Sequence, residues 1–149
     1  PILIVCNSPN SRLGNHMNVK VLRDFRDIFV GNPDCFSPEE IPCELKTLLK
    51  QPILMLSSKS TTSEYLHRMF ATHGLNLLPE VELNSNDLLM DLARIGLGIA
   101  CIPDYMLNPD DSLKPIPLAD PLPPRQLVLV QHDSLPLSQA AERFLDMFS

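Results

Sequence analysis

A run of hydroxyl-bearing residues at 57–63, Ser-Ser-Lys-Ser-Thr-Thr-Ser, is the stretch of this sequence best suited to binding a small molecule. It follows an apolar stretch at 53–56 that has the length and composition of a buried strand. Hydroxyls at such a corner cap the next helix, and the N–H groups of a helix's first turn attract anions. Open α/β sheets also bind ligands at the carboxyl ends of their strands. We therefore expect ligand contacts in this segment from Met55, Ser57, Ser58, Ser60, Thr61 and Thr62.

Two further polar corners have the same character. Asn84 and Ser85 belong to a cluster of capping residues in front of a predicted helix, so they form a second expected ligand contact by the same reasoning. Asn7 and Ser8 directly follow the apolar run at 1–6, and the strand-end rule makes them a third.

Residues for catalysis or for holding a metal are not apparent in the sequence. It contains no G-x-S-x-G, H-E-x-x-H, Walker or G-x-G-x-x-G motif. His67 and His73 are six residues apart, which does not place them on one helix face as metal ligands. Arg23 and Arg94 could each pair a carboxylate, but both are expected to be solvated surface charges. We therefore expect a binding protein without a metal or cofactor, and not an enzyme.

Composition limits the partners of this chain. The 149 residues carry a formal charge of -6, which opposes binding to a phosphate backbone, and no apolar stretch is long enough to span a membrane. The 44% apolar fraction supports a packed core. No signal peptide is evident, and no pair of cysteines has C-x-x-C spacing, so the expected compartment is the reducing cytoplasm. The four cysteines are Cys6, Cys35, Cys43 and Cys101.

Residues 84–103 predict the unit around which the chain is organised. A capped helix leads into Gly96 and Gly98, where a helix can end in a left-handed residue, and then into an apolar strand at 99–102 that stops at Pro103. This order is half of a parallel α/β crossover. A second helix is predicted after 61, with Thr61 and Glu64 as its capping box.

The remaining elements are predicted from local composition and from the glycine and proline residues that end helices and strands. Strands are predicted at 2–6, 19–30, 53–56, 80–83 and 126–130. The strand at 2–6 is expected to be an interior parallel strand, so that the chain reads as a fragment cut in front of it. Helical segments are predicted near 37–49, 104–107 and 137–148. The six prolines of 108–124 predict an extended segment at a surface or a sheet edge.

Five motifs in this order resemble the effector-binding domain of LysR-type transcriptional regulators. The clearest is the Gly-Leu-Gly-Ile turn followed by an Ile-Pro strand end within 82–103. The others are a strand with a Val-x-x-Pro stop, a proline before a strand, a hydroxyl-rich turn with its helix, and a last strand followed by Pro-Leu-Ser-x-Ala. They lie at 22–34, 45–56, 57–74 and 126–148.

The resemblance implies an α/β fold of the type II periplasmic-binding-protein kind, with the second lobe complete and the first lobe partial. Residues 1–21 and 106–149 would belong to the first lobe and 22–105 to the second, and the winged helix-turn-helix and first part of the effector domain would be missing. It further implies a small effector, often a carboxylate or other anion, held between the lobes. The partners would be that effector and further copies in a homodimer or higher oligomer, with DNA bound only through the missing N-terminal domain.

Two alternatives remain open at the level of sequence. One is a free-standing small-molecule binding domain without a role in transcription. The other is a hydrolase or transferase of α/β type, in which Ser57, Ser60 or Thr61 would be needed for turnover. The identity of the effector, the regulated genes and the sign of regulation do not follow from the residues.

Overall fold

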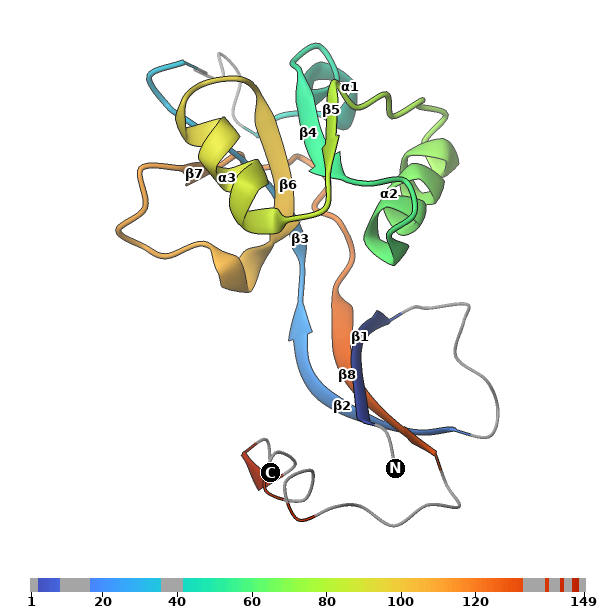
Figure 1. Cartoon of the computed structure of the whole chain (residues 1–149). Helices are drawn as coiled ribbons and strands as arrows, with labels where there is room; N and C mark the ends of the chain where they lie inside the picture. The colour runs from blue at the N-terminus through green and yellow to red at the C-terminus, as the bar shows by residue number, and fades with distance from the viewer. Residues whose placement is uncertain are drawn as a thin grey trace. The chain divides into compact units, whose positions relative to one another are not determined.

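The chain forms two compact units. The computed structural model describes residues 3–8, 17–35 and 42–132, together with Gln139, Arg143, Asp146 and Met147. One unit comprises Pro1–Phe25 and Pro124–Ser149, and the other comprises Arg26–Pro123 (Figure 1). The predicted helix start at 37–40 and most of the predicted helix at 137–148 lie outside the described residues.

A five-stranded mixed sheet is the centre of the Arg26–Pro123 unit. Its strand order is β5-β4-β6-β3-β7. β4 pairs in parallel with both β5 and β6, which confirms the predicted parallel crossover, whereas β3 is antiparallel to β6 and to β7. The bounds are Asp27–Gly31 for β3, Ile53–Leu56 for β4, Val81–Leu83 for β5, Ile99–Pro103 for β6 and Lys114–Pro115 for β7.

Helices cover both faces of this sheet because successive side chains of its strands point to opposite faces. Ile53 and Met55 of β4 pack in one core with α1 (Leu45–Leu48) and α2 (Thr61–Thr72). Leu54 lies in the other core with α3 (Asn86–Arg94), so α2 and α3 lie on opposite sides of the sheet (Figure 1).

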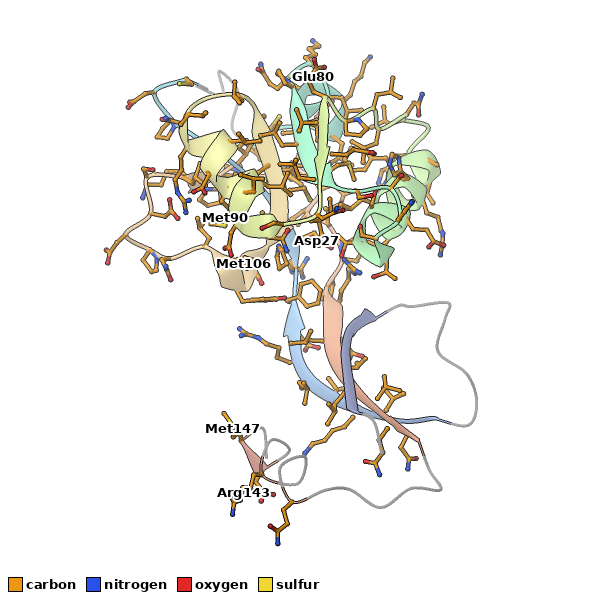
Figure 2. The ribbon with its side chains drawn as sticks, viewed as in Figure 1. Asp27, Glu80, Met90, Met106, Arg143 and Met147 are labelled. Carbon is orange, nitrogen blue, oxygen red and sulfur yellow. The ribbon has the colours of Figure 1, made fainter. Side chains whose placement is uncertain are left out.

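The two cores consist mainly of aliphatic side chains, with a few aromatic and thioether side chains among them. In the α2 core, Phe29 and Phe70 meet edge to face, with ring centroids 6.1 Å apart and an interplanar angle of 79°. In the α3 core, Met90 is part of the buried cluster and the half-buried Met106 packs against that cluster, so the two methionines lie on the same side of the sheet (Figure 2). Met106 follows β6 in the single turn Asp104–Met106. The predicted turn at 104–107 is therefore confirmed.

Glycine is required at two places in the α3–β6 connection. Gly96 has φ +85° and ends α3, as predicted. Gly98 has no positive φ, but a Cβ there would lie 2.5 Å from the carbonyl oxygen of Pro52. The hydrogen bond from Ile99 N–H to the same Pro52 oxygen, at 2.8 Å, holds the two chain segments together. Gly98 is thus needed for close approach, and the predicted left-handed conformation is found at Gly96 alone of the two.

The proline-rich segment 108–124 is extended and forms an edge strand, as expected. β7 pairs with β3 at the edge of the sheet. The segment also contributes Leu113, Ile116 and Leu122 to the cores, while most of its other residues are exposed. Its start is fixed by Asp111, whose carboxylate makes two hydrogen bonds with the guanidinium of Arg94, Nε–Oδ1 at 3.1 Å and an NH2–Oδ2 contact at 2.7 Å. Arg94 is therefore an ion-pair residue, and its prediction as a solvated charge is wrong.

The other unit contains a three-stranded antiparallel sheet. Its strands are β1 (Leu3–Ser8), β2 (Met17–Phe25) and β8 (Arg125–His132), in the order β1-β8-β2. β1 pairs with β8 in antiparallel register, which differs from the predicted parallel strand at 2–6; within the described residues it has no parallel neighbour. Sequence alternation could not reveal the direction, because a buried strand is apolar in either sheet.

The division of the chain differs from the predicted boundaries after 21 and 105. The predicted strand at 19–30 is two strands, because β2 pairs with β8 up to Phe25 and β3 pairs with β6 from Asp27. Arg26 lies between them, and its carbonyl accepts the N–H of Asp104 at 2.8 Å. The proline-rich segment stays with the larger unit up to Pro123 because its apolar side chains are part of that core.

Candidate ligand-binding site

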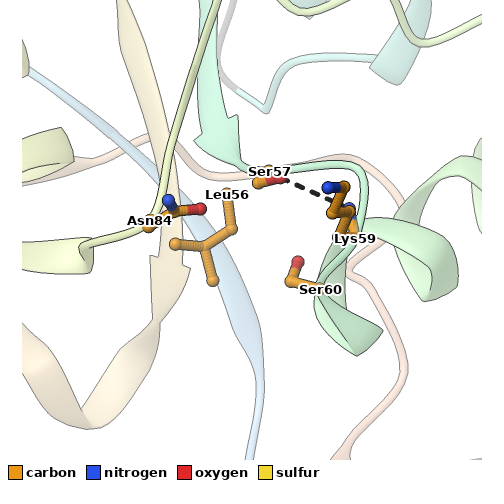
Figure 3. A pocket seen from close by; sticks show the side chains of 5 residues that line it. All are labelled: Leu56, Ser57, Lys59, Ser60 and Asn84. Carbon is orange, nitrogen blue, oxygen red and sulfur yellow. Dashed lines mark hydrogen bonds between the residues drawn. The ribbon is translucent and has the colours of Figure 1, made fainter.

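A cavity lined mostly by polar residues lies at the carboxyl ends of β4 and β5, within the larger unit. Its volume is about 400 Å³, which falls in the range of small-molecule sites. The residues that line it are Leu56, Ser57, Lys59, Ser60 and Asn84 (Figure 3).

The topology of the sheet creates this cavity. β4 and β5 are parallel neighbours, with Leu56 opposite Leu83 in the register, and Ser57 N–H donates to Leu83 O at 2.8 Å. The helices that follow these strands, α2 and α3, pack on opposite faces of the sheet. The two connections therefore diverge beyond the strand ends and leave a crevice between them, which is where open α/β sheets bind ligands.

Serine side chains fix the start of each helix beside the crevice. Ser60 is the N-cap of α2 and its Oγ accepts the N–H of Ser63 at 3.0 Å. Ser85 is the N-cap of α3 and its Oγ accepts the N–H of Leu88 at 3.3 Å. The sequence predicted Thr61 and Glu64 as the capping box of this helix. In the structure the N-cap is one residue earlier, at Ser60, whose hydroxyl binds the N–H three residues further on. Glu64 instead pairs with Arg68 at 3.0 Å.

Three of the predicted contact residues, Ser57, Ser60 and Asn84, come together in the cavity lining. Ser58 lies in the connection from β4 to α2, and Thr61 is the first residue of α2; neither is among the lining residues. Met55 and Thr62 are buried, at 1% and 7% exposure, so neither presents its side chain to solvent. The structure gives the positions of these residues. That they contact a ligand stays a prediction.

The other predicted residues have different positions. Ser85 uses its hydroxyl as the cap of α3. Asn7 and Ser8 end β1 in the smaller unit, where they pair with Leu127 and Gln126 of β8. As ligand contacts all three remain predictions.

Two lining residues, Leu56 and Lys59, were not among the contacts predicted from the sequence. Lys59 lies inside the hydroxyl-rich run, so its position was available from the sequence, and a cation within a run of donors was the signal that could have identified it. Leu56 is the last residue of β4 and is half-buried, which is how a strand-end apolar residue reaches a cavity wall.

The electrostatics of the cavity suit binding more than acid–base chemistry. Lys59 is the one ionisable residue in its lining. Asp111 and His73, whose pKa values are shifted, both lie outside that lining. The hydrogen bonds from Arg94 lower the pKa of Asp111. The carbonyl of Met69, 3.0 Å from His73 Nδ1, raises the pKa of His73, and Asp120 adds to this effect.

No metal site or membrane-spanning element is found in the described part of the chain. Residues 3–8, 17–35 and 42–132 contain no group of three His, Cys, Asp or Glu side chains able to hold a metal ion. In the same ranges, no helix has both the length and the apolar character needed to cross a membrane.

The chain contains a doubly wound unit with a cavity at its parallel strand ends, and two chain crossings connect this unit to a smaller sheet. These features define a ligand-binding domain of the type II periplasmic-binding-protein kind. The sequence model of the LysR substrate binding domain matches residues 3–149, and the chain therefore belongs to this family. No curated protein sequence is a significant match to the chain.

Solved structures confirm the fold. The regulatory domain of CcmR from Synechocystis, in complex with 2-PG, is 17% identical, with a TM-score of 0.82 over 98% of this chain and 71% of that chain. The effector binding domain of QuiR in complex with shikimate is 14% identical, with a TM-score of 0.79 over 97% and 68%.

A probable transcriptional regulator from Pseudomonas aeruginosa is 17% identical, with a TM-score of 0.79 over 99% of this chain and 50% of that chain. The chain thus spans about two thirds of the two effector domains and half of this longer regulator.

Proposed function

We propose that this chain is the effector-sensing part of a LysR-type transcriptional regulator and binds a small anion in the cavity at the ends of β4 and β5. The observation that carries the proposal is the convergence of Ser57, Lys59, Ser60 and Asn84 on one cavity of about 400 Å³. Membership of the LysR substrate binding domain family supports it, as do the 2-PG and shikimate complexes of proteins with the same fold.

In this proposal the chain acts by binding and not by catalysis. A bound effector would favour one of two arrangements of the regulator to the extent of its differential affinity for them. The readout would be DNA binding by a winged helix-turn-helix domain of the parent protein. With a formal charge of -6, the chain itself is not expected to bind operator DNA. Such a regulator would act in the reducing cytoplasm.

The proposed regulator is a homodimer or higher oligomer, and the outer face of α3 supports self-association. Leu88 and Ile95 are 45% and 69% exposed, and the half-buried Leu92 lies between them at helical spacing. An apolar stripe of this kind is typical of an interface. In analytical ultracentrifugation, Ile95→Lys should shift the chain toward the monomer. Leu78→Lys, a change at an equally exposed leucine off this stripe, should leave self-association unchanged.

A ligand screen tests the proposed site. Small carboxylates and other small anions are screened by thermal shift against the wild-type chain and two matched variants, Ser57→Ala in the cavity and Ser58→Ala beside it. We expect compounds that stabilise the wild type and Ser58→Ala alike but stabilise Ser57→Ala less. A ligand that stabilises Ser57→Ala and Ser58→Ala to the same extent would bind outside the cavity. If the wild type converts a ligand and Ser57→Ala does not, the enzyme alternative is favoured.

A further inference from the structure

The two cavity hydroxyls are oriented by backbone donors. Ser60 Oγ accepts the N–H of Ser63 at 3.0 Å, and Ser57 Oγ accepts the N–H of Lys59 in a longer contact of 3.4 Å (Figure 3). A serine hydroxyl has one hydrogen to donate and two lone pairs to accept. Because a backbone N–H occupies one lone pair in each case, the hydroxyl hydrogen is directed away from that N–H. Both serines therefore present a donor to a ligand.

One wall of the cavity is consequently rich in donors and positive in charge. The Lys59 ammonium has three donors and no acceptor. The first turn of the 12-residue helix α2 adds N–H groups and a partial positive charge on the same side. No carboxylate lines the cavity, so an anionic group at this wall would face no like charge among the lining residues.

The opposite wall differs in kind. Asn84 lies across the cavity from Lys59 and Ser60, with Leu56 between them (Figure 3). The Asn84 amide both donates and accepts, and its oxygen is the one side-chain acceptor in the lining that is neither a hydroxyl nor charged. A ligand that places an anion at the Lys59 wall would therefore match Asn84 best with a hydroxyl, which also donates and accepts.

The number of cationic side chains in the lining indicates which kind of anion the cavity favours. The lining has a single cation and no arginine, whose planar fork is the group that holds phosphate with two parallel hydrogen bonds. A carboxylate carries one negative charge and matches one ammonium, whereas a phosphate ester near neutral pH carries up to two. The net charge of -6 for the whole chain further disfavours the second charge.

We propose that the effector is a small hydroxycarboxylate, with its carboxylate on Lys59 and Ser60 and a hydroxyl on Asn84, and that Lys59 is the residue that selects for the charge. This inference rests on the proposed function, since it assigns the chemistry of the same cavity. Within that function, Lys59 and Asn84 determine specificity.

Three matched probes test the inference on the full 149-residue chain. Glycerate carries a carboxylate and hydroxyls, glyceramide replaces its carboxylate by a neutral amide of similar shape, and propionate keeps the carboxylate without hydroxyls. Backbone amide shifts are followed by NMR during each titration. We expect glycerate to shift the amides of 57–61 and of Asn84, with glyceramide binding about tenfold more weakly because it lacks the charge-assisted hydrogen bond. Propionate should shift 57–61 and leave Asn84 unchanged.

Two lysine variants locate the charge selection. In Lys59→Gln the glycerate and glyceramide dissociation constants should become equal, whereas Lys50→Gln, at an exposed lysine outside the lining, should keep the tenfold preference. Equal binding of glycerate and glyceramide by the wild type would overturn the inference and leave the proposed site intact. An Asn84 shift of the same size with propionate would overturn the hydroxyl assignment. If no probe shifts the cavity amides, the inference fails together with the proposed site.

Discussion

Gly98 illustrates how one residue fixes the scaffold of the cavity. Its Cα lies so close to the backbone of Pro52 that an added Cβ would be 2.5 Å from a carbonyl oxygen, and a backbone atom cannot move aside as a side chain can. Gly74, by contrast, has φ +70° with nothing within 4 Å of an added Cβ. The two glycines are therefore required for different physical reasons, close approach in one case and backbone conformation in the other.

This difference predicts a ranking of two alanine substitutions. Gly98→Ala should lower the free energy of unfolding by ~2–3 kcal/mol, because it forces β6 away from Pro52. Gly74→Ala should cost ~1 kcal/mol, the penalty for a left-handed residue with a Cβ. Urea denaturation of both variants measures the two losses. A larger loss for Gly74→Ala would show that the approach of Gly98 to Pro52 is not a constraint.

The Arg94–Asp111 pair is the charged contact with the clearest expected pH dependence. Its carboxylate side chain is 8% exposed and its guanidinium 35% exposed. At neutral pH, Asp111→Asn should cost ~1 kcal/mol, reduced from the value for a buried charged pair by the solvent around Arg94. Asp110→Asn, at the neighbouring exposed carboxylate, is the control and should change stability little.

The sign of the pH dependence follows from the lowered pKa of Asp111. Its folded pKa is below the ordinary 3.8, so the stabilisation is complete above about 3.8 and is lost as the pH falls through the folded value. The difference in unfolding free energy between wild type and Asp111→Asn should therefore shrink only in that acid range. A difference that instead disappears between pH 5 and 8 would contradict the assignment.

At the scale of elements, the two helix caps separate stability from binding. Ser85 caps α3 without lining the cavity, whereas Ser60 caps α2 and lines it. Replacing either serine by alanine should cost ~1 kcal/mol of stability, as expected for a lost N-cap. Ser60→Ala should in addition weaken binding of any ligand found by the thermal-shift screen, and Ser85→Ala should not. Isothermal titration compares them, and equal losses of affinity would argue against the cavity as the site.

Elements with strong local signals were predictable from the sequence, while their partners were not. The order of capped helix, glycine and apolar strand at 84–103 predicted α3, its left-handed end and β6 correctly. The same local signals could not separate β2 from β3, because Arg26 interrupts neither the apolar pattern nor the β-branched composition of 19–30. The change of pairing partner at Arg26 is a property of the tertiary structure.

The sequence predicted which connections form the candidate site, but it did not predict the full set of lining residues. A hydroxyl-rich run after a buried strand identified Ser57 and Ser60, and the second cap cluster identified Asn84. Burial of Met55 and the capping role of Ser85 depend on packing and helix phase, which a local pattern does not determine. Lys59 was overlooked because a lysine in a polar connection is usually solvated.

At the scale of the whole molecule, the chain combines a doubly wound unit with a smaller antiparallel sheet, and the two are joined at Phe25–Arg26 and Pro123–Pro124. We propose that these units are the two lobes of the effector domain. The cavity described above is formed entirely by residues of the larger unit, so that this unit alone supplies the proposed contacts for the anion.

A crystal structure of the chain with a small carboxylate selected by the thermal-shift screen tests the central claim most directly. The claim is that the strand-end cavity of the larger unit receives the effector's anionic group. We predict electron density for the carboxylate within hydrogen-bonding distance of Ser57, Ser60 and the Lys59 ammonium. A ligand bound elsewhere on the chain, with the cavity at β4 and β5 holding only water, would contradict it.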